Sequence, residues 1–204
     1  MNLLHKYLMA TEFEPKSCKD VYSAINVRQI TALMFHDEMA DFFDFLGLRG
    51  FKRMHEYQYF VESAEHRALR RYYLNHHEKI LPDEEVDPIS VIPDDWCKYS
   101  RMDVTPAVRK QAVQRALEQY RAWECETKEM YERCAYYLFS WQKIADFNKV
   151  NDLIRDVDCE LKYLTRLCLE LKAVDYDPMY IASIQDHYHD KYKKKTESIG
   201  VDIT

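Results

Sequence analysis

Residues 26–54 read NVRQITALMFHDEMADFFDFLGLRGFKRM and contain two of the three glycines in the 204-residue chain. From about Lys19 onward, apolar side chains recur every three or four positions, which is the period of an amphipathic helix. The pattern predicts a first helix over residues 19–46, because Gly47 readily adopts the left-handed conformation that ends a helix. The helical period resumes at Phe51. A connection this short joins antiparallel neighbours, so the stretch predicts a helical hairpin.

The second helix is expected over residues 51–80, and a segment without periodicity follows over residues 81–104. Pro82, Pro88 and Pro93 lie in this segment. Roughly two dozen residues without regular structure are unusual inside a compact domain. They are, however, long enough to run the length of a bundle whose helices, at about 1.5 Å per residue, measure about 40 Å. The segment is therefore predicted to be a crossover connection.

Three further helix starts stand out after the crossover. Thr105 followed by Pro106 combines a side-chain cap with a proline at the first helical position, where the missing N–H costs nothing. Asp146 is expected to cap the next helix, and Asp177 with Pro178 to begin a shorter terminal one. The three helices are expected over residues 105–140, 146–172 and 177–195.

No segment has the period-two alternation of a strand, so the predicted class is all-α. Four long helices with one long crossover between the second and third define the ferritin-like version of the four-helix bundle. The short fifth helix follows at the C-terminus. The length predicts one domain over residues 1–204, with its core at about 19–195.

Composition excludes several classes of function. Apolar residues make up 47% and charged residues 31%, as in a soluble globular protein. The formal net charge of −6 gives no general attraction to nucleic acid or anionic lipid, and no stretch approaches the roughly 20 apolar residues of a membrane-spanning helix. The six cysteines form no C-x-x-C pair, so neither a zinc site nor a disulfide framework is expected. With no convincing secretory signal, the predicted compartment is the cytoplasm.

The sequence resembles ferritins in layout and spacing. Residues 26–54 resemble their first helix and the turn that ends it, and RRYYLNHHEKILP (70–82), Trp96, RALEQYRAWE (115–124) and FNKVNDLIRDVDCELKYL (147–164) continue in the same order. The resemblance covers residues 21–192. It implies binding of iron or another divalent metal, Fe(II) oxidation with oxygen, and assembly as a homo-oligomer.

Ferritin-like di-iron sites draw Glu and His side chains from several helices into the bundle, because carboxylates bridge iron ions and imidazole adds a nitrogen donor. By this resemblance, Gln29 within RQITA stands where ferritins have a Glu. Glu62 matches the second-helix Glu. Glu65 stands where a His is expected, and His66 arrives one residue later, about 100° around the helix.

The later helices match less closely. The third-helix Glu of the resemblance falls near Tyr120, with Glu118 and Glu124 close by, and on the fourth helix Glu160 fits, with Asp156 one turn before it. His36 lies seven residues after Gln29, where ferritins commonly have a Tyr. The predicted metal-site residues are Gln29, His36, Glu62, Glu65, Asp156 and Glu160.

Three interpretations remain open. The chain is a metal-binding, ferroxidase-like or iron-storage protein, a ferritin-like bundle whose metal site has decayed into an assembly or partner-binding module, or an unrelated helical adaptor. Charged helix residues usually form a solvated face, and His36 alone is more often a packing residue than a ligand. The pairs His76–His77 and His187–His189 are predicted to be weak ligands, because neighbours one or two apart on a helix do not face each other.

Self-association is predicted from an aromatic surplus on the first two helices. A single core face cannot hold all of the aromatic side chains there. They include Phe42, Phe45, Phe51 and Tyr59.

Overall fold

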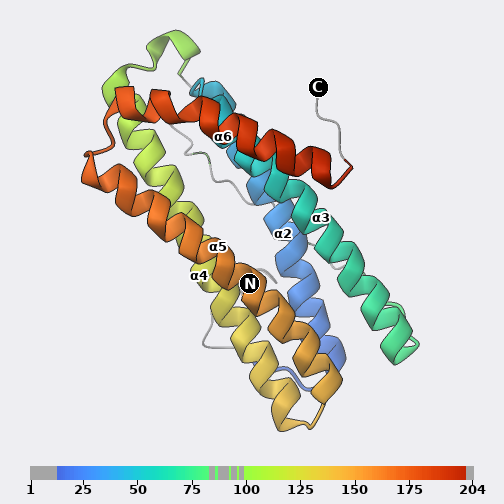
Figure 1. Cartoon of the computed structure of the whole chain (residues 1–204). Helices are drawn as coiled ribbons and strands as arrows, with labels where there is room; N and C mark the ends of the chain where they lie inside the picture. Colours follow the sequence, from blue (N-terminus) through green and yellow to red (C-terminus); the bar gives the residue numbers. More distant parts are fainter. Residues whose placement is uncertain (1–12, 83–85, 87–91, 93–95, 97–98, 201–204) are drawn as a thin grey trace.

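The computed structural model describes residues 13–82, 86, 92, 96 and 99–200, and over these ranges it contains helices and no strand. The helices form two long antiparallel pairs, with a last helix crossing one end (Figure 1). They are α2 (Cys18–Phe45), α3 (Arg49–His77), the 3-10 helix η2 (Arg101–Asp103), α4 (Pro106–Ser140), α5 (Ile144–Ala173) and α6 (Pro178–Ser198). The predicted all-α bundle with a short C-terminal helix is confirmed.

Each antiparallel pair closes through a turn with one residue in the left-handed region. In the α2–α3 turn this residue is Gly47, with φ 73°, and the N–H of Leu48 donates to the Phe43 carbonyl at 2.9 Å. The α4–α5 turn uses Gln142, with φ 58°. Such turns give partners to carbonyls that the last helical turn leaves without one. Gly47 thus ends α2 as its position in the sequence predicts.

Two of the three predicted helix starts are confirmed, and one is wrong. The Thr105 hydroxyl accepts from the backbone N–H of Val108, and the Asp177 carboxylate accepts from that of Tyr180. Asp146 does not cap α5, which begins at Ile144. Its side chain is buried and accepts hydrogen bonds from other helices. A tertiary contact has replaced the expected local one.

The end of α3 and the start of α4 lie at opposite ends of the bundle (Figure 1). The chain between them therefore spans its length, as expected for a crossover, although most of residues 83–98 lie outside the described part. α3 ends at His77, before the predicted residue 80, because Glu78 adopts a left-handed φ of 54°. Ile92 and Trp96 of the crossover pack against the core.

The bundle interior contains two apolar clusters separated by a polar layer. One cluster lies at the α6 end and includes Phe43, Phe51 and Leu117. The other lies at the opposite end and includes Ile25 and Leu138. The side chains of the layer between them are buried or half-buried: Arg28, Gln29, His36, His55, Glu62, Glu65, Glu124, Thr127 and Glu160. Burial of polar groups is unfavourable without partners, so this layer is a candidate functional site.

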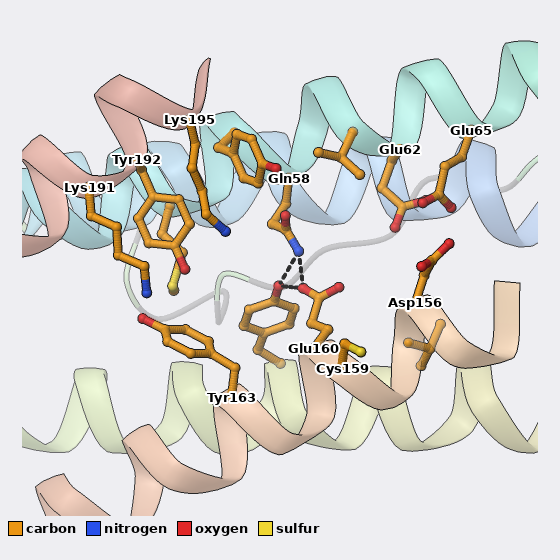
Figure 2. A pocket seen from close by; sticks show the side chains of 15 residues that line it. Gln58, Glu62, Glu65, Asp156, Cys159, Glu160, Tyr163, Lys191, Tyr192 and Lys195 are labelled. Atoms are coloured by element: carbon orange, nitrogen blue, oxygen red, sulfur yellow. Dashed lines mark hydrogen bonds between the residues drawn. The ribbon is translucent and has the colours of Figure 1, made fainter. Parts of the chain in front are cut away.

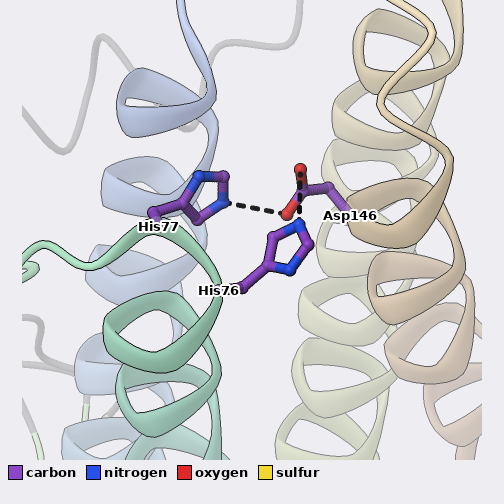
Figure 3. Close-up of side chains that lie close together, drawn as sticks. All are labelled: His76, His77 and Asp146. Atoms are coloured by element: carbon purple, nitrogen blue, oxygen red, sulfur yellow. Dashed lines mark hydrogen bonds and ion pairs between the residues drawn. The ribbon is translucent and has the colours of Figure 1, made fainter.

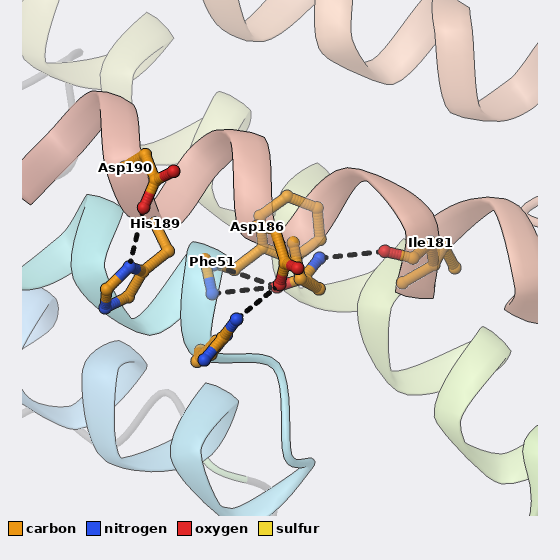
Figure 4. A network of polar contacts seen from close by, with 8 residues as sticks. Phe51, Ile181, Asp186, His189 and Asp190 are labelled. Carbon is orange, nitrogen blue, oxygen red and sulfur yellow. Dashed lines mark hydrogen bonds and ion pairs between the residues drawn. The ribbon is translucent and has the colours of Figure 1, made fainter.

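α6 docks on the start of α3 through backbone contacts (Figure 4). The Gln185 side-chain carbonyl accepts from the backbone N–H groups of Gly50 and Phe51, at 3.0 and 3.2 Å. These N–H groups belong to the first turn of α3, where no intrahelical acceptor exists. A side chain at Gly50 would place its Cβ 2.3 Å from the Gln185 backbone oxygen. Glycine is therefore required where the two helices touch.

The aromatic surplus that motivated self-association is mostly covered by the chain itself. Phe42 packs edge-on against Trp96 of the crossover, and Phe51 packs edge-on against Tyr188 of α6. Both phenylalanines are buried, so the surface argument is wrong for them. Assembly as a homo-oligomer stays a prediction that does not rest on these residues.

Among the described helices, none combines the length and the apolar character that crossing a membrane requires. The five described cysteines are free thiols.

Candidate metal centre

A cavity of about 430 Å³ lies in the polar layer, between α3, α5 and α6 (Figure 2). Glu62 and Glu65 of α3 are three residues apart, so they share one helix face, and both point toward α5. Asp156 and Glu160 of α5 are four residues apart and point back toward α3. Four carboxylates from two helices thus face one cavity.

The α6 end of the cavity is lined by lysines and tyrosines (Figure 2). The ammonium group of Lys191 lies 4.0 Å from the centre of the Tyr163 ring. Lys195 lies 5.3 Å from the centre of the Tyr192 ring. Both are cation–π distances. Positive charge therefore borders one side of the carboxylate group.

Glu160 is held in place by two hydrogen-bond donors. The Gln58 amide of α3 and the Tyr120 hydroxyl of α4 both donate to its Oε1, and Gln58 also donates to the Tyr120 hydroxyl at 3.2 Å. Burial raises the pKa of Glu160 to about 7, although the Gln58 hydrogen bond acts in the opposite direction. The network fixes one carboxylate oxygen and leaves the other to face the cavity.

Behind the cavity, Glu124 of α4 and His36 of α2 approach Glu160. One ligand atom from each of the three lies within 4.8 Å of the others. His36 and His55 contact each other through their Nδ1 atoms at 2.9 Å. Burial lowers the pKa of His36 to about 3 and that of His55 well below its usual value, so both imidazoles are neutral.

The buried Nε2 atom of His36 has no hydrogen-bond partner among the described residues. In the tautomer where His36 Nδ1 donates to His55, this Nε2 carries a lone pair. A neutral imidazole oriented by a hydrogen bond on its other nitrogen is the usual form of a histidine metal ligand. His36 therefore has the form of a ligand and lies within reach of two carboxylates.

Arg28 supplies a fixed positive charge to the same layer. Its guanidinium is buried, donates to the Thr127 hydroxyl at 2.8 Å and to the Trp123 carbonyl at 2.6 Å, and stacks 3.4 Å from the centre of the Trp123 ring. Burial lowers the pKa of Arg28 to about 10, while Glu124 raises it. Arg28 thus remains charged at neutral pH and partly balances the carboxylates.

Burial in this layer disfavours the charged form of its carboxylates and raises their pKa values. Burial raises the pKa of Glu124 to about 7 against the opposing effect of Arg28. Burial, and then the charge of Asp156, raise the pKa of Glu65 to about 7. For Glu62, burial and the neighbouring carboxylates raise the pKa well above its usual range. A bound cation would favour the charged form of all three.

The donor set fits a divalent transition metal. Carboxylate oxygens together with a neutral imidazole nitrogen suit Fe²⁺, Mn²⁺ and Zn²⁺, and the unpartnered Nε2 of His36 gains a partner when such an ion binds. Glu124, Glu160 and His36 are the residues that would hold it first. Glu62 and Glu65 face the same space from α3.

The six sequence-predicted residues do not all lie close enough together to bind one metal ion. Four of them, Glu62, Glu65, Asp156 and Glu160, line the cavity. Gln29 is fully buried in the polar layer, and neither atom of its amide has a hydrogen-bond partner in the described part of the chain. Asp156 is exposed at the rim of the cavity. His36 and Glu160 approach each other across the interior, while Glu62 and Glu65 lie half-buried on α3.

The predicted metal-site set does not include three residues that belong to this layer, although Glu124 was noted close to the third-helix position. Glu124 has a local signal, since it follows the buried Tyr120 by four residues and precedes the buried Thr127 by three. Arg28 adjoins Gln29, but a guanidinium at that position resembles a solvated helix residue. His55 has no local signal, because only the fold brings it to His36.

Comparisons with known proteins support the architecture. No family model matches the sequence, and no curated protein matches it. Among solved structures, a humanized archaeal ferritin superimposes with a TM-score of 0.67 at 12% sequence identity, over 87% of this chain and 98% of that chain. At an identity this low, the comparison supports a similarity of fold alone. In helix order, crossover and extent, the chain has a ferritin-like fold.

Proposed function

We propose that this protein binds iron, or another divalent transition metal, in the polar layer of its bundle. The proposal rests on two observations: one ligand atom from each of His36, Glu124 and Glu160 lies within 4.8 Å of the others, and the buried His36 Nε2 has no hydrogen-bond partner among the described residues. Burial raises the pKa values of Glu124 and Glu160 to about 7, and a compensating positive charge would favour the charged form of each carboxylate. An ion in this space supplies that charge.

The chain's own residues prepare the site in three ways. His55 orients the His36 imidazole through the contact between their Nδ1 atoms, and Gln58 and Tyr120 hold one oxygen of Glu160. Asp156, which is exposed, and Glu65 line the same cavity as Glu160 and add carboxylate charge on that side. A bound iron ion would supply redox chemistry, and Fe(II) oxidation is what the ferritin resemblance implies.

A second function has specific support from Arg28 and Gln29. The guanidinium is a resident cation, and an amide stands where the ferritin resemblance places a carboxylate. Both reduce the net negative charge of the layer. In this alternative, Arg28 balances the carboxylates without a metal, and the bundle acts as an assembly or partner-binding module.

Metal titration separates the two functions. Metal-free protein is titrated with Fe²⁺ under anaerobic conditions, and with Mn²⁺ followed by electron paramagnetic resonance, for the wild type and for Glu124→Gln and Glu62→Gln. Each variant removes one carboxylate charge from the proposed site. We therefore expect at least a tenfold loss of metal affinity in both variants. Glu118→Gln is the matched control, since Glu118 is an exposed glutamate on the same helix.

The outcomes are distinct. Stoichiometric binding that Glu124→Gln and Glu62→Gln both leave unchanged would mean that the polar layer is not the metal site. A wild type that binds neither ion, together with a raised thermal midpoint in Glu124→Gln, favours the assembly module, because removal of an unneeded buried charge stabilises a fold. In the same samples, oxygen consumption after addition of Fe²⁺ measures Fe(II) oxidation.

A further inference from the structure

Two histidines and an aspartate meet at the end of the bundle opposite α6 (Figure 3). His76 and His77 are the last two residues of α3, and Asp146 lies in the first turn of α5. The Nε2 atom of His77 lies 3.0 Å from Asp146 Oδ1, and the Nε2 atom of His76 lies 3.8 Å from Oδ2. One ligand atom from each residue lies within 4.8 Å of the others.

A hydrogen-bond network alone does not account for this arrangement. His77 at 3.0 Å and the Tyr22 hydroxyl at 2.8 Å both contact Asp146 Oδ1. His76 points at the same carboxylate from 3.8 Å, which is too long for a hydrogen bond. Ligand atoms about 2.1 Å from a tetrahedral Zn²⁺ ion are roughly 3.4 Å apart. The two observed separations, which run to different oxygens of the same carboxylate, lie on either side of that value.

Neighbouring groups hold the three side chains in this orientation. The His76 ring stacks on Tyr72 with 5.2 Å between ring centres, and the His77 ring packs on Tyr73 with 4.6 Å. The Tyr22 hydroxyl orients the carboxylate from outside the cluster. Such supporting contacts are typical of metal ligands, because they fix the direction of the donor atoms.

One helix end favours a cation at this cluster. The C-terminus of α3 carries the negative end of its dipole at the two imidazoles. Asp146 contributes a carboxylate that is 1% exposed, whereas the His76 side chain is 42% exposed. An ion bound here would therefore be enclosed on the Asp146 side and open to solvent on the His76 side.

We propose that His76, His77 and Asp146 form a second metal site, selective for borderline divalent ions of the Zn²⁺ class and separate from the polar layer. Two imidazole nitrogens and one carboxylate oxygen suit Zn²⁺, Co²⁺ and Fe²⁺, and disfavour Mg²⁺ and Ca²⁺. His76 is fourteen residues along α3 from Glu62, which is about 21 Å of helix. The two sites therefore bind independently, with one position at the second site left for water.

The test uses Co²⁺ and Zn²⁺ as probes of the full chain. Four-coordinate Co²⁺ with nitrogen ligands absorbs strongly in the visible range, and Zn²⁺ affinity is measured by calorimetry. In His76→Ala we expect the Co²⁺ absorption of this site to disappear and its Zn²⁺ affinity to fall at least tenfold. In Glu124→Gln, which alters the polar layer, the same signals are expected to persist.

Two further variants complete the design. His187→Ala is the control for a surface histidine next to an aspartate, and it is expected to behave as wild type. Asp146→Asn removes the carboxylate charge but keeps the shape, and is expected to weaken Zn²⁺ binding as well. His76 makes no hydrogen bond to Asp146, so His76→Ala is expected to fold normally. A folded His76→Ala with unchanged Zn²⁺ affinity and Co²⁺ spectrum overturns the proposal.

Discussion

At the scale of single residues, Arg28 contributes the buried positive charge of the polar layer. Its guanidinium contacts the Thr127 hydroxyl and the Trp123 carbonyl, and it interacts electrostatically with Glu124 and Glu62. It therefore stabilises the charged carboxylates and would repel the metal ion of the proposed site. These two effects have opposite consequences when the charge is removed.

Arg28→Met is expected to tighten Mn²⁺ binding and to destabilise the metal-free protein. Two unit charges roughly 8 Å apart interact by about 2 kcal/mol at an effective dielectric constant of about 20, so the gain in affinity is expected to be about tenfold or more. Loss of the guanidinium removes its buried hydrogen bonds to the Thr127 hydroxyl and the Trp123 carbonyl, which costs about 1–3 kcal/mol of unfolding free energy. Calorimetry at pH 8 and urea denaturation measure the two effects.

Arg28→Lys is the control, because it keeps the charge and loses the planar fork. It is expected to show part of the loss in stability without the gain in affinity. If Arg28→Met and Arg28→Lys bind Mn²⁺ equally, the charge of Arg28 does not act on the metal site.

At the scale of secondary-structure elements, the contact between Gly50 and α6 positions one wall of the cavity. α6 carries Lys191, Tyr192 and Lys195, which line it. A Cβ at Gly50 meets backbone atoms of Gln185, which cannot move aside as a side chain can. The whole helix would have to shift.

Gly50→Ala is therefore expected to lower the unfolding free energy by about 1–3 kcal/mol, the usual range for overpacking, and to weaken metal binding by opening the cavity. Thermal denaturation and Mn²⁺ titration measure these effects. Gly47→Asn is the control, since Asn tolerates the left-handed conformation there and no atom would contact its Cβ. Equal stability of Gly50→Ala and wild type would contradict the close packing of α6 on α3.

The elements themselves could be predicted from sequence because their signals are local. Gly47, Thr105–Pro106 and Asp177–Pro178 determine backbone conformation or capping within a few residues, and each ends or begins a helix as expected. Asp146 also resembles a cap, but its carboxylate is drawn into contacts with Tyr22 and His77. These partners lie 124 and 69 positions away along the chain, where helical periodicity carries no information.

The same limit applies to the candidate sites. Glu62 and Glu160 were predicted because the ferritin resemblance implies a carboxylate at each of these positions. His55 enters the layer only through its contact with His36, and His76 and His77 gain a shared partner only when α5 is placed beside α3. On an isolated helix, His76 and His77 point in different directions, so the sequence alone predicts weak metal ligands.

At the scale of the whole molecule, buried titratable groups set the dependence of stability on pH. Glu65, Glu124 and Glu160 have pKa values raised from 4.5 to about 7, so the folded state holds their protons longer than the unfolded state. The stability they contribute is complete below pH 4.5 and is lost as pH rises through 7. The pKa of His36 is lowered from 6.5 to about 3, so its contribution is complete above pH 6.5 and is lost as pH falls.

The metal-free protein is therefore expected to be most stable in mildly acidic solution and less stable at pH 8. Saturating Mn²⁺ removes the loss on the alkaline side, because the ion favours ionised carboxylates. The rise in thermal midpoint on adding Mn²⁺ is expected to grow from pH 5.5 to pH 8. Glu124→Gln should flatten that growth, and a rise independent of pH in the wild type would contradict the assignment.

The arrangement of the helices as two hairpins also predicts the order in which the parts of the chain fold. α2 with α3 and α4 with α5 share extensive contacts, whereas α2 and α4 share few. Each hairpin closes a short loop and can form early, while joining the two requires the long crossover to be ordered. His36 belongs to one hairpin, and Glu124 and Glu160 belong to the other. The polar layer is therefore expected to be completed last and to open first, and native-state hydrogen exchange along α2 and α4 tests this. An ion bound at the proposed site would then connect the two hairpins.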